Sequence, residues 1–288
     1  MTETLKLVYS AAKVRLGFLI MLCALAGLAV SPESSLTSWQ ILVLAITVLL
    51  CSSSAGAFNQ WYERDIDSKM KRTKTRPFVT GRFAASFYWP AGIVLISAFA
   101  ILALAITTNL AAAFYLFLGA FCYGVVYTIW LKRRTWWNVV IGGLAGSFAV
   151  LAGAAAVDVN IAPSAIILSV VLFLWTPPHF WALAIHRKDD YAKENIPMLP
   201  VTHGVQFTKL QIILYTIIMM LVSLFPFVVM MSGVFYLFSA LILGIIFLYY
   251  SIALYFDEEN KLAFPTFVYS IYYIFLIFAA LLIDHYLI

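Results

Sequence analysis

Three oxygen-bearing side chains recur every four residues near the end of the second long apolar segment of the chain. They are Asn59, Glu63 and Asp67. If the helix predicted for that segment continues through them, the three side chains stack on one helix face. Amide and carboxylate oxygens suit a hard cation such as Mg²⁺, which keeps several waters and is typically shared with substrate phosphates. Asp65 points away from this face and ranks below the two other carboxylates as a ligand.

A basic run follows this acidic face. Arg72 and Arg76 carry guanidinium groups, which grip anionic oxygens in a bidentate manner. Lys69, Lys71 and Lys74 need no such role, because loops on the cytoplasmic side of a membrane collect basic residues. That tendency does not explain acidic side chains at the end of a membrane helix, where they are costly and usually functional. The pattern therefore favours a metal-diphosphate site over a solvated loop.

A second basic group lies after the fourth apolar segment. Lys132 and Arg133 follow Tyr127 and Thr128 there, and tryptophans flank them. Taken alone, the group is typical of the interfacial end of a membrane helix. The residues themselves leave both an interfacial role and an anion-binding role open.

The sixth apolar segment contains Pro177 and Pro178. Adjacent prolines interrupt backbone hydrogen bonding and are tolerated where a membrane helix is buried in protein or lines a cavity. His179, His186 and Asp190 are spaced by seven and four residues, so a continued helix would share one face among them. A single histidine in an apolar helix is usually a hydrogen-bonded core residue. For His179, the neighbouring prolines, the two tryptophans and the polar end of the helix favour a functional role. These tryptophans are Trp175 and Trp181.

The composition indicates which elements position these groups. Hydrophobic residues make up 64% of the 288 residues and charged residues 11%, which excludes an ordinary soluble domain, and 16% aromatic residues exclude a disordered chain. A spanning helix needs roughly 20 apolar residues. We therefore predict an all-α polytopic membrane protein, a single domain over residues 1–288 with nine transmembrane helices in a bundle around an intramembrane cavity. The nine apolar segments span residues 16–31, 39–58, 86–106, 110–130, 138–157, 162–184, 209–231, 234–255 and 264–283.

The positive charge follows the expected membrane topology. The 18 Lys and Arg residues lie before the first apolar segment or in alternate connections, with Lys209 at the boundary between such a connection and the seventh segment, and the net charge is +5. Because cytoplasmic loops carry the basic excess, the N-terminus is predicted to be cytoplasmic and the C-terminus outside. This distribution also argues against nucleic acid as a partner. The two long polar connections on the cytoplasmic side, residues 59–85 and 186–208, are predicted to form a catalytic cap.

The three cysteines all lie in apolar segments. Cys23, Cys51 and Cys122 are predicted to be packed thiols, with no redox or metal-binding role. The first apolar segment lacks a small-residue cleavage site, so we expect it to stay in the protein as a helix.

Together, these constellations resemble the motifs of the UbiA-type intramembrane prenyltransferases. The run Asn-Gln-x-x-Glu-Arg-Asp-x-Asp-x-x-Met-x-Arg-Thr, which begins at Asn59, is similar to the first motif of the heme O synthase (protoheme IX farnesyltransferase) family. Gln60 and Glu63 replace the Asp-Asp pattern of the wider group. The segments Tyr-Thr-x-x-Leu-Lys-Arg and Pro-His-Phe-Trp resemble the same family, and the resemblance covers residues 59–204.

The resemblance implies a Mg²⁺-dependent enzyme that transfers the farnesyl group of farnesyl diphosphate to the 2-vinyl group of protoheme IX (heme b). Water is added in the same reaction, and the products are heme O and diphosphate. The site residues so implied fall into four groups: catalytic Glu63, Asp67 and Asp190; metal-binding Asn59, Glu63, Asp67, Asp189 and Asp190; diphosphate-binding Arg72, Arg76, Lys132 and Arg133; and heme- or acceptor-binding Trp175, His179, Trp181 and His186.

The second metal-binding motif departs from the pattern of the wider group. Where UbiA-type relatives have Asp-x-x-x-Asp, this chain has His186 four residues before Asp190. Asp190, with Asp189, could hold one Mg²⁺ more weakly, and the number of Mg²⁺ ions is left open. A contact with the porphyrin or its propionates is the alternative role for His186. Asn195 stands where a glycine is common in relatives, at a turn that asparagine also adopts.

The distribution of basic residues predicts a multi-pass protein with its active site at the cytoplasmic face, and the absence of an Arg-rich, acid-poor presequence favours a bacterial inner (plasma) membrane over an organelle. The implied partners are farnesyl diphosphate, heme b, the lipid bilayer, and heme A synthase or other oxidase assembly proteins. Two alternatives stay open: a prenyltransferase for a quinone precursor or chlorophyll-type tetrapyrrole, and a non-catalytic heme-handling assembly protein. A transporter or channel fits less well, because the charge gathers at one face and the chain shows no repeated halves.

Overall fold

The chain is a multi-pass membrane protein built from helices. The computed structural model describes residues 3–31, 36–70 and 72–287, with side chains up to Asp284. Every regular element in those ranges is helical. They contain eight helices long and apolar enough to span a membrane, and a ninth span results if the bent pair α1 and α2 counts as one. The predicted all-α class is confirmed, and the predicted nine spans match the count that includes the bent pair.

Two parts of the sequence interpretation lie outside the described residues. They are residues 32–35, within the first predicted outer connection, and Lys71 of the basic run. The other predicted segments begin and end within a few residues of the observed helices. Three ends differ by four residues: α12 begins at Val205 instead of 209, α3 ends at Tyr62 instead of 58, and α15 ends at Leu287 instead of 283.

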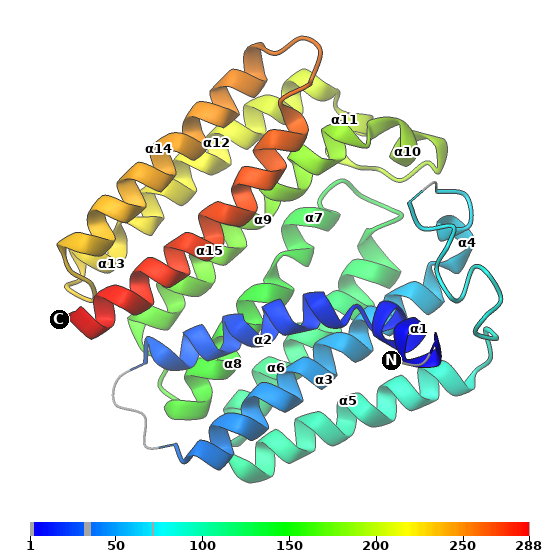
Figure 1. The fold of residues 1–288 in the computed structure, drawn as a ribbon, viewed down its shortest axis with the longest axis horizontal. Helices are drawn as coiled ribbons and strands as arrows, with labels where there is room; N and C mark the ends of the chain where they lie inside the picture. The colour runs from blue at the N-terminus through cyan, green and yellow to red at the C-terminus, as the bar shows by residue number, and fades with distance from the viewer. Residues whose placement is uncertain (1–2, 32–35, 71, 288) are drawn as a thin grey trace. The chain divides into compact units, whose positions relative to one another are not determined.

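The helices form two compact units, and each is described by itself. The first unit runs to Leu131 and includes Leu144–Ile161. Its long helices α2, α3, α5, α6 and α8 lie side by side in Figure 1. Its elements are α1 (Glu3–Ala11), α2 (Val14–Ala29), α3 (Ser38–Tyr62), α4 (Arg64–Asp67), α5 (Tyr88–Thr107), α6 (Leu110–Phe121), the π-helix η1 (Cys122–Leu131) and α8 (Leu144–Val157).

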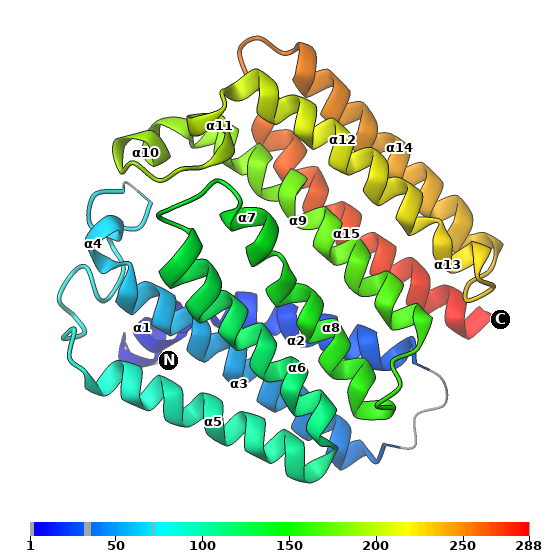
Figure 2. The same cartoon turned by 180° about the vertical axis from the view of Figure 1, so that it is seen from behind.

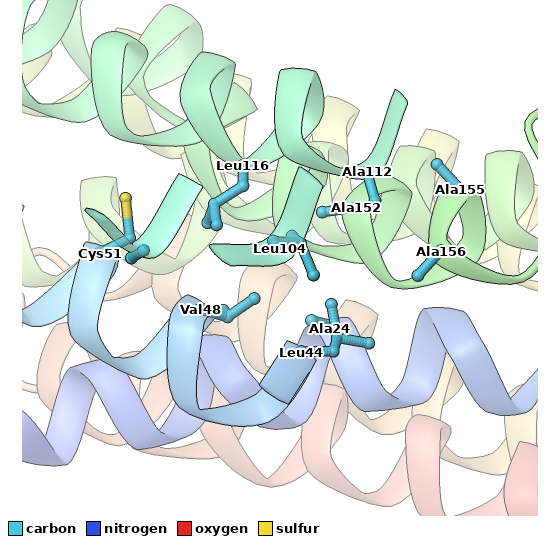
Figure 3. Close-up of a cluster of buried hydrophobic side chains, with 11 residues drawn as sticks. Ala24, Leu44, Val48, Cys51, Leu104, Ala112, Leu116, Ala152, Ala155 and Ala156 are labelled. Carbon is cyan, nitrogen blue, oxygen red and sulfur yellow. The ribbon is translucent and has the colours of Figure 1, made fainter. Parts of the chain in front are cut away.

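Small residues let the helices of the first unit approach closely. A Cβ atom added at Gly27 or Gly153 would clash with a backbone carbonyl oxygen, that of Val150 or Ala24 respectively. The backbones of α2 and α8 are therefore in direct contact at both glycines. Figure 3 shows the buried cluster around this contact, which consists of Ala24, Leu44, Val48, Cys51, Ala100, Leu104, Ala112, Leu116, Ala152, Ala155 and Ala156.

Helix α3 carries the first predicted constellation at its C-terminal end. At its N-terminus, Thr37 and Gln40 form a capping box, in which each side chain accepts a hydrogen bond from the other residue's backbone N–H. The helix ends at Tyr62, because Glu63 leaves the helical region with φ −92° and ψ 10°. Helix α4 then begins at Arg64. The acidic segment is therefore helical on both sides of one irregular residue.

The second unit contains Lys132–Gly143 and the residues from Ala162 onward. Helix α9 packs against α12 and α15, and α14 packs against both α12 and α15, as Figure 2 shows. Its elements are α7 (Asn138–Gly142), α9 (Pro163–His186), α10 (Lys188–Lys193), α11 (Leu199–Thr202), α12 (Val205–Ser223), α13 (Phe225–Val228), α14 (Val234–Phe256) and α15 (Ala263–Leu287).

Buried charged side chains hold both ends of α14. At its N-terminus, Asp284 of α15 accepts hydrogen bonds from the backbone N–H groups of Gly233 and Tyr236, the latter at 3.1 Å. At its C-terminus, Lys209 of α12 donates to the carbonyl oxygen of Asp257 at 2.6 Å. An acid at a helix N-terminus and a base at a C-terminus both complement the helix dipole. These two contacts therefore fix α14 against its neighbours.

The three cysteines are packed as thiols within helices, as predicted. Cys51 and Cys122 are buried, and Cys23 is half-buried. All three lie within helices of the first unit, where they pack as small apolar side chains.

Candidate active site

The stacking predicted for the first constellation is present. The backbone N–H of Glu63 donates to the carbonyl oxygen of Asn59 at 3.0 Å, and that of Asp67 donates to Glu63 at 2.9 Å. The helical spacing thus continues across the joint between α3 and α4. Asn59, Glu63 and Asp67 are 2%, 1% and 3% exposed, whereas Asp65 is exposed. Three oxygen-bearing side chains are therefore buried together on the face that the spacing predicts.

The amide of Asn59 is oriented from two sides. Its Nδ2 donates to the hydroxyl of Thr128 at 3.1 Å, and that hydroxyl donates to the carbonyl oxygen of Tyr123 at 2.8 Å. On the other side, the ammonium of Lys13 donates to Oδ1 of Asn59 and to the hydroxyl of Tyr123 at 3.2 Å. Both tyrosine and threonine belong to η1. The π-helix therefore helps to position the first ligand candidate.

Lys13 is a site residue that the sequence interpretation missed. Its backbone is left-handed, with φ 49°, and it separates α1 from α2, which are bent by 52°. Its ammonium lies 5.7 Å from the ring centroid of Tyr123. In the sequence, Lys13 is only one of several basic residues before the first apolar segment. No local pattern indicates that its partner lies 46 residues away, at Asn59.

Asp67 has a cationic partner from the predicted diphosphate-binding pair. Arg76 Nη1 lies 2.5 Å from Asp67 Oδ2, and the arginine side chain is mostly buried. The hydroxyl of Thr73, which is also buried, donates to the backbone oxygen of Asp67 at 3.0 Å. Arg72 is instead exposed. The structure therefore brings one of the two predicted arginines to the carboxylate of Asp67.

The donor set fits a hard cation. Two buried carboxylates and one amide oxygen share a face, and the cationic groups of Lys13 and Arg76 already contact two of the three. Over residues 3–31, 36–70 and 72–284, no three His, Cys, Asp or Glu side chains are grouped to hold one metal. A Mg²⁺ ion here would complete its ligand shell with the amide oxygen, waters and substrate phosphate oxygens, as Mg²⁺ commonly does.

The second constellation is divided between the two units. In the first unit Thr128 is buried and Tyr127 stacks on Tyr123 at 5.6 Å between ring centroids. In the second unit Lys132 is half-buried and Arg133 is exposed. Thr128 therefore orients the amide of Asn59 through its hydroxyl. The anion-binding role of Lys132 and Arg133 stays a prediction.

The third constellation surrounds His179 with aromatic rings. The imidazole is buried between the rings of Trp175 and Phe267, with centroids 4.2 Å and 4.6 Å away and both nearly parallel to it. Its Nδ1 lies 2.6 Å from the hydroxyl of Ser270 on α15. Trp181 is also buried, but its ring meets Tyr215 of α12 edge-on at 5.2 Å. The two predicted tryptophans therefore face different helices.

The continuous helix predicted through Asp190 is interrupted at Arg187. Helix α9 runs through both prolines without a break but ends at His186, because Arg187 leaves the helical region with φ −112° and ψ 21°. Asp190 lies on the separate helix α10, where its Oδ2 is 3.9 Å from Nη1 of Arg187. Asp189 is exposed. His186 is exposed and its ring lies 5.1 Å from that of Phe264.

The turn after α10 agrees with its prediction. Asn195 is left-handed, with φ 51°. The backbone N–H of Ile196 then donates to the carbonyl oxygen of Tyr191 at 3.0 Å, which closes the turn. Asparagine tolerates this conformation better than most residues, so the departure from glycine at this position keeps the local geometry.

Comparisons with known proteins identify the family and the fold of the chain. A family model described as the UbiA prenyltransferase family matches residues 20–282. Protoheme IX farnesyltransferase 2 of Paramagnetospirillum magneticum is 46% identical over 284 residues, which cover 99% of this chain and 98% of that protein. Protoheme IX farnesyltransferase of Stutzerimonas stutzeri is 45% identical, over 96% of this chain and 92% of that protein.

Solved structures share the fold at low sequence identity. A structure of digeranylgeranylglyceryl phosphate synthase matches with a TM-score of 0.81 at 16% identity and covers 100% of both chains. A UbiA homolog from Archaeoglobus fulgidus bound to DMAPP and Mg²⁺ matches with a TM-score of 0.69 at 16% identity, over 96% of this chain and 99% of that chain. Since the family model matches most of the sequence and close relatives match nearly all of it, the chain belongs to the UbiA prenyltransferase family.

Proposed function

We propose that this chain transfers the farnesyl group of farnesyl diphosphate to the 2-vinyl group of protoheme IX (heme b), with addition of water, to give heme O and diphosphate. The observation that carries this proposal is the identity of 46% over nearly the whole chain with a protein named protoheme IX farnesyltransferase 2. The buried stack that begins at Asn59 supports it, because a transferred allylic group needs a site that accepts the leaving diphosphate.

Mg²⁺ is the proposed cofactor, and Asn59, Glu63 and Asp67 would hold it. This is supported by their buried oxygen donors and by the relative bound to DMAPP and Mg²⁺. When bound, the ion would supply positive charge that stabilises the departing diphosphate. In the second unit Asp190 and Asp189 are proposed to hold a metal ion more weakly, with Asp190 also acting in catalysis.

The chain's own cations are proposed to neutralise the leaving diphosphate. Arg76 and Lys13 contact the buried stack, and they would turn toward phosphate oxygens when the donor binds. Arg72, Lys132 and Arg133, which are less buried, are also proposed to bind diphosphate. Apolar and aromatic side chains of the bundle would keep water from the allylic cation until the acceptor attacks.

The acceptor is proposed to lie against Trp175, His179, Trp181 and His186. The half-buried ring of Trp175 offers an apolar surface to a porphyrin, and the exposed His186 offers a polar edge to a propionate. We further propose that the N-terminus is cytoplasmic, the C-terminus outside, and the active site at the cytoplasmic face of a bacterial plasma membrane. Residues 59–85 and 186–208 would form its catalytic cap. Heme A synthase and oxidase assembly proteins are the proposed recipients of the product.

One experiment tests the transferase proposal. Membranes containing the protein are incubated with heme b, farnesyl diphosphate and Mg²⁺, with and without a chelator, and the hemes are analysed by mass spectrometry. We expect a heavier heme that disappears when the chelator is present. Absence of that product would favour a heme-handling assembly protein. A prenylated quinone precursor or chlorophyll-type tetrapyrrole in parallel incubations, without heavier heme, would favour a different acceptor.

A further inference from the structure

The imidazole of His179 is held in position by three aromatic rings and one polar contact. Trp175 and Phe267 cover its two faces, and Phe180 meets it edge-on at 5.0 Å. Its Nδ1 lies against the hydroxyl of Ser270. Among the residues that the structure describes, Nε2 has no hydrogen-bond partner. The ring therefore has one defined polar contact, and its second nitrogen is left for a ligand.

The hydroxyl of Ser270 decides which nitrogen of His179 carries the proton. Ser270 Oγ donates to the carbonyl oxygen of Phe267, one turn back in α15, at 2.6 Å. A hydroxyl has a single proton, so toward the histidine the same oxygen can only accept. Nδ1 must then be the nitrogen that bears hydrogen. In the neutral imidazole the other nitrogen, Nε2, carries the lone pair.

A further contact holds Ser270 in place. The indole Nε1 of Trp175 donates to the backbone oxygen of Ser270 at 2.7 Å. The same tryptophan stacks on the imidazole, so α9 and α15 are joined at this serine by two polar contacts. Ser270 is fully buried, and solvent does not compete for its hydroxyl. The tautomer is therefore set by protein geometry.

We propose that Ser270 is a positioning residue, which keeps His179 in the tautomer whose Nε2 ligates the iron of the acceptor heme. This inference rests on the proposed function, since heme b is the acceptor there. Histidine that ligates a metal through one nitrogen usually donates its other N–H to an oxygen, which fixes the tautomer and raises ligand basicity. Neutral imidazole is also a common axial ligand of heme iron. His179 and Ser270 have that arrangement, because Nδ1 contacts the serine hydroxyl and the heme substrate would bring its iron to Nε2.

The test uses heme b without farnesyl diphosphate, so that turnover is not needed. The detergent-purified protein is titrated with heme b, and the iron–imidazole stretching vibration of the reduced complex is measured by resonance Raman spectroscopy. His179→Ala is expected to abolish the vibration. Ser270→Ala is expected to shift it and to weaken heme binding about tenfold or more, in the range typical of lost second partners of metal ligands. Ser251→Ala is the matched control, because Ser251 is another buried serine whose hydroxyl donates one turn back, to Phe247 at 2.9 Å.

A second variant pair keeps the proposal testable if Ser270→Ala unfolds. In His179→Gly, added imidazole can still donate to Ser270, whereas 1-methylimidazole has no N–H to donate. We expect imidazole to restore the iron–nitrogen vibration at lower concentration than 1-methylimidazole. Equal rescue by both, or a vibration in His179→Ala identical to that of the unchanged protein, would overturn this inference. If the unchanged protein still makes the heavier heme in that case, the transferase proposal stands, and if it makes none, the transferase proposal itself fails.

Discussion

Asp65 and Asp67 belong to the same short helix, yet their side chains have different surroundings. Asp67 is buried beside Arg76, whereas Asp65 is exposed. A buried carboxylate interacts strongly with a cation because little water screens it, and an exposed one is screened by water and salt. The two positions therefore allow a test that separates a specific site from a generally acidic segment.

Removing one charge from the stack should stop the reaction. We expect Glu63→Gln and Asp67→Asn each to lower heme O formation at least about 100-fold, the scale on which loss of one group that stabilises a transition-state charge acts. Asp65→Asn, the matched control, should keep nearly full activity. Product is measured per amount of protein in the membrane. Near-normal turnover by either buried variant, at normal membrane levels, would refute the metal assignment.

Lys13 offers a second residue-scale prediction. Its ammonium donates to Asn59, and hydrogen bonds to charged groups contribute about 1.5–3 kcal/mol. We expect Lys13→Met to lower turnover about tenfold and to raise the KM for farnesyl diphosphate. Lys6→Met removes the same charge from the exposed helix α1 and is the control. Equal effects of both variants on the KM would mean that only the total charge near the N-terminus matters.

At the scale of elements, the π-helix η1 connects the parts of the first constellation. A π-helical turn is wider than an α-helical one and is frequently found at functional sites. Here η1 supplies Thr128 to the amide of Asn59 and Tyr123 to the ammonium of Lys13. Contacts between α3, η1 and the α1–α2 joint thus determine where the side chain of Asn59 points.

The contact between α2 and α8 leads to a prediction of stability. A methyl group at Gly153 would clash with the backbone of Ala24, so a helix must shift to accept it. We expect Gly153→Ala to lower the free energy of unfolding by about 1–3 kcal/mol, as overpacking commonly does. In the control Gly92→Ala, a Cβ meets no atom within 4 Å. The midpoint of thermal unfolding in detergent should fall for the first variant only, and an equal response of both would contradict the close contact.

Across the described residues, the long helices expose large apolar side chains, whereas the basic residues lie mainly in the connections between helices. On α5, for example, Val94, Leu95 and Phe99 are exposed. A surface of this kind is stable in lipid and prone to associate in water. The proposed orientation then follows from the basic residues, which collect in the connections predicted to be cytoplasmic.

The orientation can be tested by labelling single cysteines. Val159 and Thr75 are both exposed, and they lie in connections predicted to be on opposite sides of the membrane. In a variant whose native cysteines are replaced, Val159→Cys should react with a membrane-impermeant reagent in intact cells. Thr75→Cys should react only after the membrane is opened. The reverse pattern would invert the proposed topology.

The spans and the stacked face could be predicted because they depend on local periodicity. Hydropathy marks each membrane helix, and a spacing of four residues places Asn59, Glu63 and Asp67 together. Partners distant in the chain could not be predicted in this way. Lys13 contacts a residue 46 positions away, and Ser270 contacts one 91 positions away. The break at Arg187 was also missed, because helical spacing alone does not show where a helix ends.

The direct backbone contact at Gly27 and Gly153 also has an evolutionary consequence. At these positions any side chain would displace a carbonyl group of the facing helix, so we expect nearly every mutation there to be selected against. At lipid-facing positions such as Val94 and Leu95, one apolar residue replaces another with little effect. Under selection for heme O synthesis, a randomised library should therefore keep both glycines while the outer face of α5 diversifies freely.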